Sequence, residues 1–100
     1  MKLLTKKLRD QLRSVTYNED EQDPIVYAKF FTCWANWTWF VTEGWEEGDD
    51  FIFFGYVIGL EKEWGNFSLR ELESIRWGPL GVEREIYFTP RRLSELLDIV

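Results

Sequence analysis

The sequence predicts a single α+β domain over residues 1–100, in which one antiparallel sheet of about four strands, a meander, packs with two or three helices. A chain of 100 residues suits one hydrophobic core. The composition, 45% hydrophobic and 18% aromatic, excludes disorder for the body of the chain. The predicted elements run helix, three strands, short helix, strand, helix, and short loops between strands favour antiparallel neighbours.

The first predicted element is a helix from about Thr5 to Ser14. Leu4, Leu8 and Leu12 follow one another at intervals of four residues and therefore form one apolar stripe. Thr5 stands where an N-cap residue is preferred. The first turn is basic, which opposes the helix dipole, so we expect packing of the stripe on the domain to stabilise this helix.

Two strands are predicted next, over residues 25–32 and 36–42, with a turn at 33–35 between them. Pro24 ends an acidic linker, 17–23, and restricts the residue before it to extended conformations. The second strand alternates apolar and polar side chains, which indicates one buried face and one wetter face.

The segment 43–50 is predicted to be a loop because it contains two glycines and five acidic residues. A third strand is predicted over residues 51–62. Both of its faces are apolar as far as Leu60, so we expect a central strand or one that a helix covers.

The following helix has a recognisable start. Ser68 and Glu71 match a capping box, and Phe67 and Leu72 stand where a hydrophobic staple forms. We expect this helix to end at about Ile75.

The remaining residues are predicted to form a turn, a strand and a terminal helix. Gly78 and Pro79 mark the turn, and residues 82–88 have the pattern of a fourth strand. Thr89 as N-cap and Pro90 in the first helical position predict where the terminal helix begins.

The composition also limits the chemistry. With no histidine and one cysteine, the chain cannot form an intramolecular disulfide, and zinc sites built from these two residue types are excluded. Cys33 has no histidine to activate it and is expected to behave as a small hydrophobic side chain. Neither a phosphate-binding glycine loop nor a nucleophile motif is present. We therefore predict no enzyme, no cofactor and no metal site; a carboxylate-dependent hydrolase and a divalent cation on loop carboxylates are less favoured alternatives.

The sequence also bears on location. The N-terminal residues carry charge and no continuous apolar region, unlike a signal peptide. The longest nearly apolar run, residues 51–60, is about half as long as a membrane-spanning helix. We expect a cytoplasmic protein without membrane contact.

Charge is unevenly distributed along the chain. Residues 16–75 hold three basic and thirteen acidic side chains, within a chain of net charge −6. Such a segment repels phosphate, so direct binding of nucleic acid is not expected. Two interpretations remain open. The acidic side chains keep a very hydrophobic protein in solution, or they bind a basic surface, for instance by placing carboxylates where the phosphates of DNA would lie.

The candidates for partner contact are carboxylates of the loop 43–50 and the linker 17–23, together with tryptophans in or beside turns, which can anchor a protein partner. The alternative for the tryptophans is that they cap the ends of the core. Aromatic side chains also stack nucleic-acid bases, but Lys29 is the one basic residue from 25 to 60, so core packing is favoured there. The candidate residues are Glu46, Glu47, Asp49, Asp50, Trp45, Glu19, Asp20, Glu21, Asp23, Trp34 and Trp64.

Four segments carry a family resemblance: MKLLTKKLR at the start, KFFTCWANWTWFVTE (29–43), FFGYVIGLEKEWGNFSLRELESI (53–75) and GVEREIYFTP (81–90). They resemble a bacterial family designated domain-of-unknown-function family 2958, and the resemblance covers nearly the whole chain. It implies carriage on plasmids, conjugative elements and phages, sometimes in fusion with DNA-processing or anti-restriction modules. No catalytic residues are established for this family, so the resemblance implies none here.

Two functions are therefore expected as alternatives. The first is a small acidic protein-binding or inhibitory module of a mobile genetic element, which interferes with a host nucleic-acid-handling defence complex of the anti-restriction or anti-CRISPR type. Its partner would be a host protein with a basic surface. The second is a non-catalytic structural or regulatory accessory domain of plasmid or phage origin, acting as a homodimer or as a partner subunit.

Overall fold

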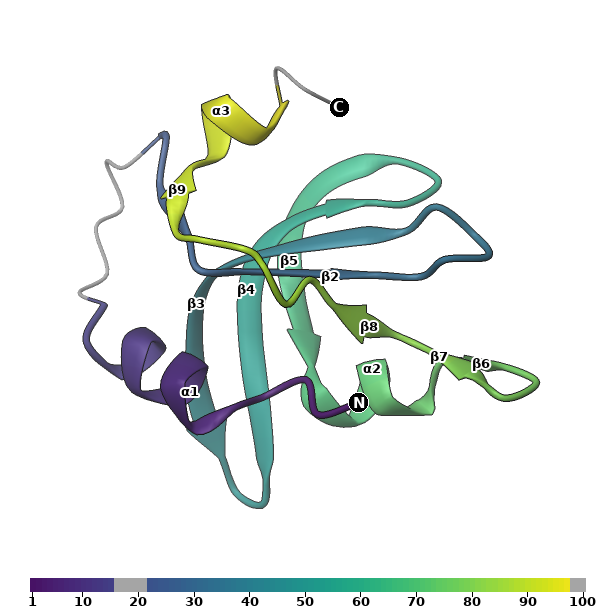
Figure 1. The fold of residues 1–100 in the computed structure, drawn as a ribbon. Coiled ribbons are helices and arrows are strands. Elements are labelled where there is room, and N and C mark those ends of the chain that lie inside the picture. Colours follow the sequence, from purple (N-terminus) through teal and green to yellow (C-terminus); the bar gives the residue numbers. More distant parts are fainter. Residues whose placement is uncertain (16–21, 98–100) are drawn as a thin grey trace.

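The structure, a computed structural model, describes residues 1–15 and 22–97. These residues confirm the α+β class: they form one five-stranded antiparallel sheet, two small two-stranded sheets and three short helices (Figure 1). The main sheet consists of β2 (Ala28–Phe31), β3 (Thr38–Glu47), β4 (Asp50–Ile58), β5 (Lys62–Ser68) and β8 (Glu83–Arg84). The small sheets pair β1 (Ile25–Val26) with β9 (Arg91–Arg92), and β6 (Arg76–Trp77) with β7 (Leu80–Gly81). The helices are α1 (Lys6–Arg13), α2 (Leu69–Ser74) and α3 (Leu93–Leu97).

The main sheet has the strand order β5-β4-β3-β2-β8. The predicted meander is formed by β2 to β5, and β8 returns to the outer side of β2. The main sheet has one strand more than the sequence predicted, because the predicted third strand ends early and β5 forms beyond it, where no strand was predicted. β4 ends at Ile58, the Gly59 N–H donates to the Glu61 carbonyl at 2.9 Å, and β5 follows this turn. One glycine within an apolar run is a weak turn signal.

The predicted loop at 43–50 is wrong, because β3 and β4 form one long hairpin through it. Their pairing runs from Thr38 opposite Ile58 to Glu47 opposite Asp50, with a β-bulge after Val41. Gly48, with φ of 60°, opens the two-residue turn in the left-handed conformation that glycine adopts freely. Cross-strand pairing has therefore outweighed the loop-like acidic composition.

One face of the sheet carries the main hydrophobic core, covered by α1 and α2. Leu4, Leu8 and Leu12 are buried as predicted, in the same cluster as Phe30 and Phe53. The predicted N-cap is also confirmed, since Thr5 Oγ1 accepts a hydrogen bond from the Leu8 N–H at 3.1 Å. In Figure 1, α1 lies beside β3 on the side of the β3–β4 hairpin, and α3 lies near the opposite end of the molecule.

The other face carries a smaller buried cluster beneath α3. Val26, Phe40, Leu93 and Leu96 form it, and Tyr56 and Ile58 pack against it. Phe40 is 1% exposed. The expectation of one wetter face for the strand at 36–42 is therefore wrong at this position, because α3 covers it.

The two later helices differ in how well their starts were predicted. α2 begins as expected: Ser68 Oγ accepts from the Glu71 N–H at 3.0 Å, and Phe67 and Leu72 are both buried. α3 does not begin at Thr89 and Pro90, because residues 91–92 instead pair with β1 as β9. No helix within residues 1–15 and 22–97 is long and apolar enough to span a membrane.

Two predicted turns are confirmed, at residues 33–35 and at Gly78-Pro79, where the second joins β6 to β7. The fourth strand is much shorter than the predicted 82–88, because only β8 retains strand geometry. Beyond it the Tyr87 N–H donates to the Glu85 carboxylate at 3.2 Å, so the backbone turns away from the sheet.

Candidate protein-interaction surface

Part of the α3 side of the sheet is uncovered and aromatic. The register places Trp45 opposite Ile52 and Tyr56 opposite Trp64, and directly paired residues share a face of the sheet. Phe54 lies on the same face, between Ile52 and Tyr56 along β4. We call this surface the aromatic face; it consists of Trp45, Ile52, Phe54, Tyr56 and Trp64.

Three rings of the aromatic face, those of Phe54, Tyr56 and Trp64, contact one another. Trp64 lies against Phe54, with ring centroids 5.8 Å apart and an interplanar angle of 14°, and meets Tyr56 edge-on at 5.2 Å. Trp45 and Trp64 are each 43% exposed. The sheet backbone and these ring contacts therefore present two large exposed side chains on a preformed surface.

Among the described residues, most of this face lies outside the buried core. Of its members, Tyr56 packs against the cluster beneath α3, whereas Trp45, Ile52, Phe54 and Trp64 belong to neither buried cluster. The expectation of a central strand is confirmed for β4, which lies between β3 and β5, but only one of its faces is fully covered.

A carboxylate lies within this surface. Glu43 is paired with Phe54 across the strands and precedes Trp45 by two residues on the same side of β3. Its side chain is half-buried, and burial raises the pKa of Glu43 above its ordinary value. Within the described residues no lysine or arginine forms an ion pair with it. The aromatic face therefore contains an anion without a cation.

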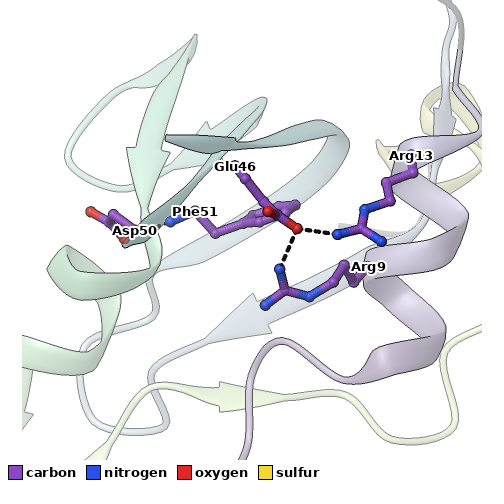
Figure 2. Close-up of polar contacts among 5 residues, drawn as sticks. All are labelled: Arg9, Arg13, Glu46, Asp50 and Phe51. Carbon is purple, nitrogen blue, oxygen red and sulfur yellow. Dashed lines mark hydrogen bonds and ion pairs between the residues drawn. The ribbon is translucent and has the colours of Figure 1, made fainter. Parts of the chain in front are cut away.

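The predicted contact residue Glu46 is already bound within the molecule. Figure 2 shows its carboxylate between two arginines of α1; Arg9 Nη1 lies 2.6 Å from Glu46 Oε1, and Arg13 donates to the same oxygen. Hydrogen bonds from Arg13 and Arg9 hold the pKa of Glu46 below its usual value. Arg9 also lies over the Phe51 ring, 5.3 Å from its centroid. Glu46 thus joins α1 to the hairpin on the face opposite Trp45.

Two more of the predicted carboxylates have internal partners. Asp49 forms an ion pair with Arg70 at 2.5 Å. Asp50 accepts hydrogen bonds from the backbone N–H groups of Phe51 at 2.7 Å and Arg70 at 3.2 Å. Burial would raise the pKa of Asp50, but these donors outweigh burial and lower it. Glu47 is exposed and forms no ion pair with a described residue.

The predicted linker carboxylates fall into two groups. Glu19, Asp20 and Glu21 lie outside the described residues. Asp23 accepts hydrogen bonds from the backbone N–H and the hydroxyl of Ser94, at 2.9 and 2.8 Å, and these bonds lower its pKa. Asp23 therefore stabilises the first turn of α3.

The tryptophans and the cysteine also differ from expectation. Trp34 lies in the predicted turn and is half-buried. Trp45 and Trp64 lie within paired strands rather than in or beside turns. Cys33 is exposed in the turn, whereas the sequence predicted that it would behave as a small hydrophobic side chain.

Sequence reasoning missed Glu43 as well as Phe54 and Tyr56. The signal was present in the alternation of residues 52, 54 and 56, which share one face of any strand. Their apolar character suggested burial, and nothing local indicated that α3 would end before reaching them.

The structure also contains a cavity of about 260 Å³ between the N-terminal segment, α2 and the β6–β7 hairpin. Its lining combines apolar side chains with three charged residues. Its lining comprises Met1, Leu3, Leu72, Glu73, Arg76, Pro79, Leu80, Gly81, Val82 and Glu83. In the described ranges no three cysteine, histidine or acidic side chains are grouped as a metal site would require.

Comparison with known proteins gives one match. A family model described as "Protein of unknown function (DUF2958)" matches residues 3–100. No curated protein and no solved structure matches the chain.

Proposed function

Because the chain belongs to the domain-of-unknown-function family 2958, whose description assigns no activity, we propose a function from its geometry: a non-catalytic protein-binding module that binds its partner through the aromatic face. The observation that carries the proposal is the pair of exposed tryptophans, Trp45 and Trp64, on a rigid sheet surface. Tryptophan and tyrosine are enriched among the residues that dominate protein–protein binding energy. A preformed surface also loses little conformational entropy on binding.

The proposed partner is a protein with a basic surface, in a host nucleic-acid-handling complex. The net charge of −6 and the unpaired carboxylates of Glu43 and Glu47 favour a positively charged partner. Direct binding of single-stranded nucleic acid is less favoured, because base-stacking surfaces lie in positive grooves and this surface contains an anion. Interference with a defence complex on behalf of a mobile element remains part of this proposal.

Mimicry of DNA phosphates receives less support than contact through the aromatic face. Of the four acidic candidates in the β3–β4 hairpin, Glu46, Asp49 and Asp50 have partners within the molecule. A carboxylate that is already paired attracts a second cation less strongly.

The test is affinity capture from bacterial lysate with three tagged proteins. We expect the wild type to retain a basic partner at low salt and to release it at high salt. Trp64→Ala removes the central ring of the aromatic face and should weaken retention by about 30-fold or more, the effect of losing a dominant interface side chain. Trp77→Ala is the control, since Trp77 is 64% exposed but lies in the separate β6–β7 sheet.

The proposal fails if Trp64→Ala, shown by circular dichroism to be folded, retains the partner as well as the wild type does. Equal loss with Trp64→Ala and Trp77→Ala would also contradict it, because the contact would then not be specific to the aromatic face.

One observation favours the second candidate function, an accessory domain that acts as a homodimer or as a partner subunit. Within the described residues no strand pairs with the outer side of β5, whereas the N-terminal segment lies along β8, where Arg84 Nε donates to the Lys2 carbonyl at 3.3 Å. An unpaired edge can accept a strand from a second copy. Sedimentation over a range of concentrations separates the two functions, since a stable dimer that Trp64→Ala dissociates would favour the accessory domain.

A further inference from the structure

We propose that the aromatic face binds an arginine side chain of the partner protein, with its guanidinium group paired to the Glu43 carboxylate and packed against the neighbouring aromatic rings. This inference rests on the proposed function and specifies what the aromatic face recognises.

The first argument is the position of Glu43. Its carboxylate is half-buried beside Phe54 and Trp45, and no cation among the described residues is paired with it. A partly buried charge is unfavourable unless an opposite charge or hydrogen-bond donors compensate it. The carboxylates of Glu46 and Asp50, on the same hairpin, have such compensation within the molecule. Glu43 has no such compensation among the described residues.

The second argument is the chemistry around the carboxylate. The faces of tryptophan, tyrosine and phenylalanine rings attract cations, and the attraction increases when the site is desolvated. A guanidinium group is planar, is weakly hydrated, stacks on aromatic rings and can donate two hydrogen bonds to one carboxylate. An ammonium group is more strongly hydrated and meets these demands less well. The combination of a carboxylate and aromatic rings on one sheet surface therefore favours arginine.

The third argument is the shape of the surface, which decides the source of the cation. Sites for small molecules are concave and enclose most of the ligand. The aromatic face is the open side of a sheet, and Trp45 and Trp64 are each 43% exposed. Only a partner that covers the face can exclude water from the ion pair, so the arginine belongs to a protein surface rather than to a free small molecule.

The first experiment uses the wild-type protein and three blocked peptides, acetyl-Gly-Arg-Gly-amide and its lysine and citrulline versions. The readout is the set of indole N–H signals of the six tryptophans in NMR spectra of the ¹⁵N-labelled protein. We expect the arginine peptide to shift the Trp45 and Trp64 signals with a dissociation constant in about the millimolar range, and Trp77 to be unaffected. Citrulline has nearly the same shape without the charge and should have no effect.

The second experiment compares two conservative variants. Glu43→Gln should weaken binding of the arginine peptide by about tenfold or more, because it removes the charge at the proposed contact. Glu73→Gln is the control: Glu73 is exposed on α2, which covers the other face of the sheet, and it has no ion pair among the described residues. It should bind like the wild type.

Three results would overturn the inference: no shift of Trp45 or Trp64 up to about 50 mM arginine peptide, equal shifts with citrulline, or unchanged binding by Glu43→Gln. The citrulline comparison uses the wild type and so does not depend on folding of a variant. If Trp64→Ala loses the captured partner while Glu43→Gln keeps it, the proposed function stands and the arginine site fails. If both variants keep the partner, both proposals fail.

Discussion

Gly44 and Gly65 are two strand glycines with opposite surroundings. A Cβ atom on Gly44 would lie 2.6 Å from the Phe51 ring and 2.9 Å from Leu12 Cδ1, whereas one on Gly65 would meet nothing within 4 Å. α1 therefore packs closely against the sheet at Gly44, and the lack of a side chain there is a packing requirement.

We predict that Gly44→Ala destabilises the protein by about 1–3 kcal/mol, the usual cost of overpacking a core. Gly65→Ala, the matched control, should be neutral or slightly stabilising, because its site is open and glycine in a strand is entropically unfavourable. Urea denaturation of both variants measures this. Equal stability of the two would show that α1 is not packed against Gly44.

We expect the partly buried Glu43 carboxylate, unpaired among the described residues, to lower the free energy of unfolding of the unbound protein. Its pKa is raised by burial above the ordinary 4.5, so the folded state holds this proton more tightly than the unfolded state does. Protonated Glu43 therefore favours the folded state. This contribution to the free energy of unfolding is complete below the ordinary pKa and is lost as pH rises through the raised pKa of the folded state.

We accordingly predict that Glu43→Gln raises the thermal midpoint relative to wild type at neutral pH, and that the difference shrinks as pH falls through the raised pKa of Glu43 toward about 4.5, the ordinary value. Thermal denaturation between acidic and neutral pH tests this, with Glu47→Gln as control. A midpoint below that of the wild type at neutral pH would mean that Glu43 is compensated in the unbound protein, against the argument for an arginine partner.

Among the secondary-structure elements, α1 depends on the β3–β4 hairpin for more than burial of its leucines. Its arginines Arg9 and Arg13 both bind Glu46, and Arg9 also covers Phe51. This arrangement offsets the mutual repulsion of two like charges one turn apart on the helix.

We predict that Glu46→Lys lowers the thermal midpoint by a few degrees, since it places a third cation beside Arg9 and Arg13. Glu47→Lys changes the charge equally, one residue further along β3, and should have little effect on stability because Glu47 has no ion pair in the described ranges. Differential scanning calorimetry distinguishes the two.

In the molecule as a whole, the two faces of the main sheet have different surroundings. One face is buried by α1 and α2, and the other is closed by α3 near Phe40 and Ile58 but open at Trp45 and Trp64. The buried clusters beneath α1 and α2 and beneath α3 stabilise the fold. The open part leaves a rigid aromatic surface available to a partner, at the cost of a surface that can self-associate.

Local chemistry allowed several parts of this arrangement to be predicted. The leucine stripe of α1, the Thr5 cap and the Ser68 capping box each depend on residues within four positions of one another, so neighbouring residues were sufficient evidence. The α+β class followed from the order of such segments. The β3–β4 hairpin was not predictable in the same way, because its stability comes from pairs such as Trp45 with Ile52.

By itself the sequence determined the class of fold and the helix starts that depend on local caps. It also supplied the aromatic residues, some of which the fold leaves exposed. Only the tertiary structure decided which of them stay exposed and which carboxylates stay unpaired. Arg9 and Arg13 reach Glu46 across more than thirty residues of chain, and Asp23 caps a helix that begins seventy residues later. Glu43 has no such partner in the described residues, and this difference arises from where strands and helices meet, which no local pattern records.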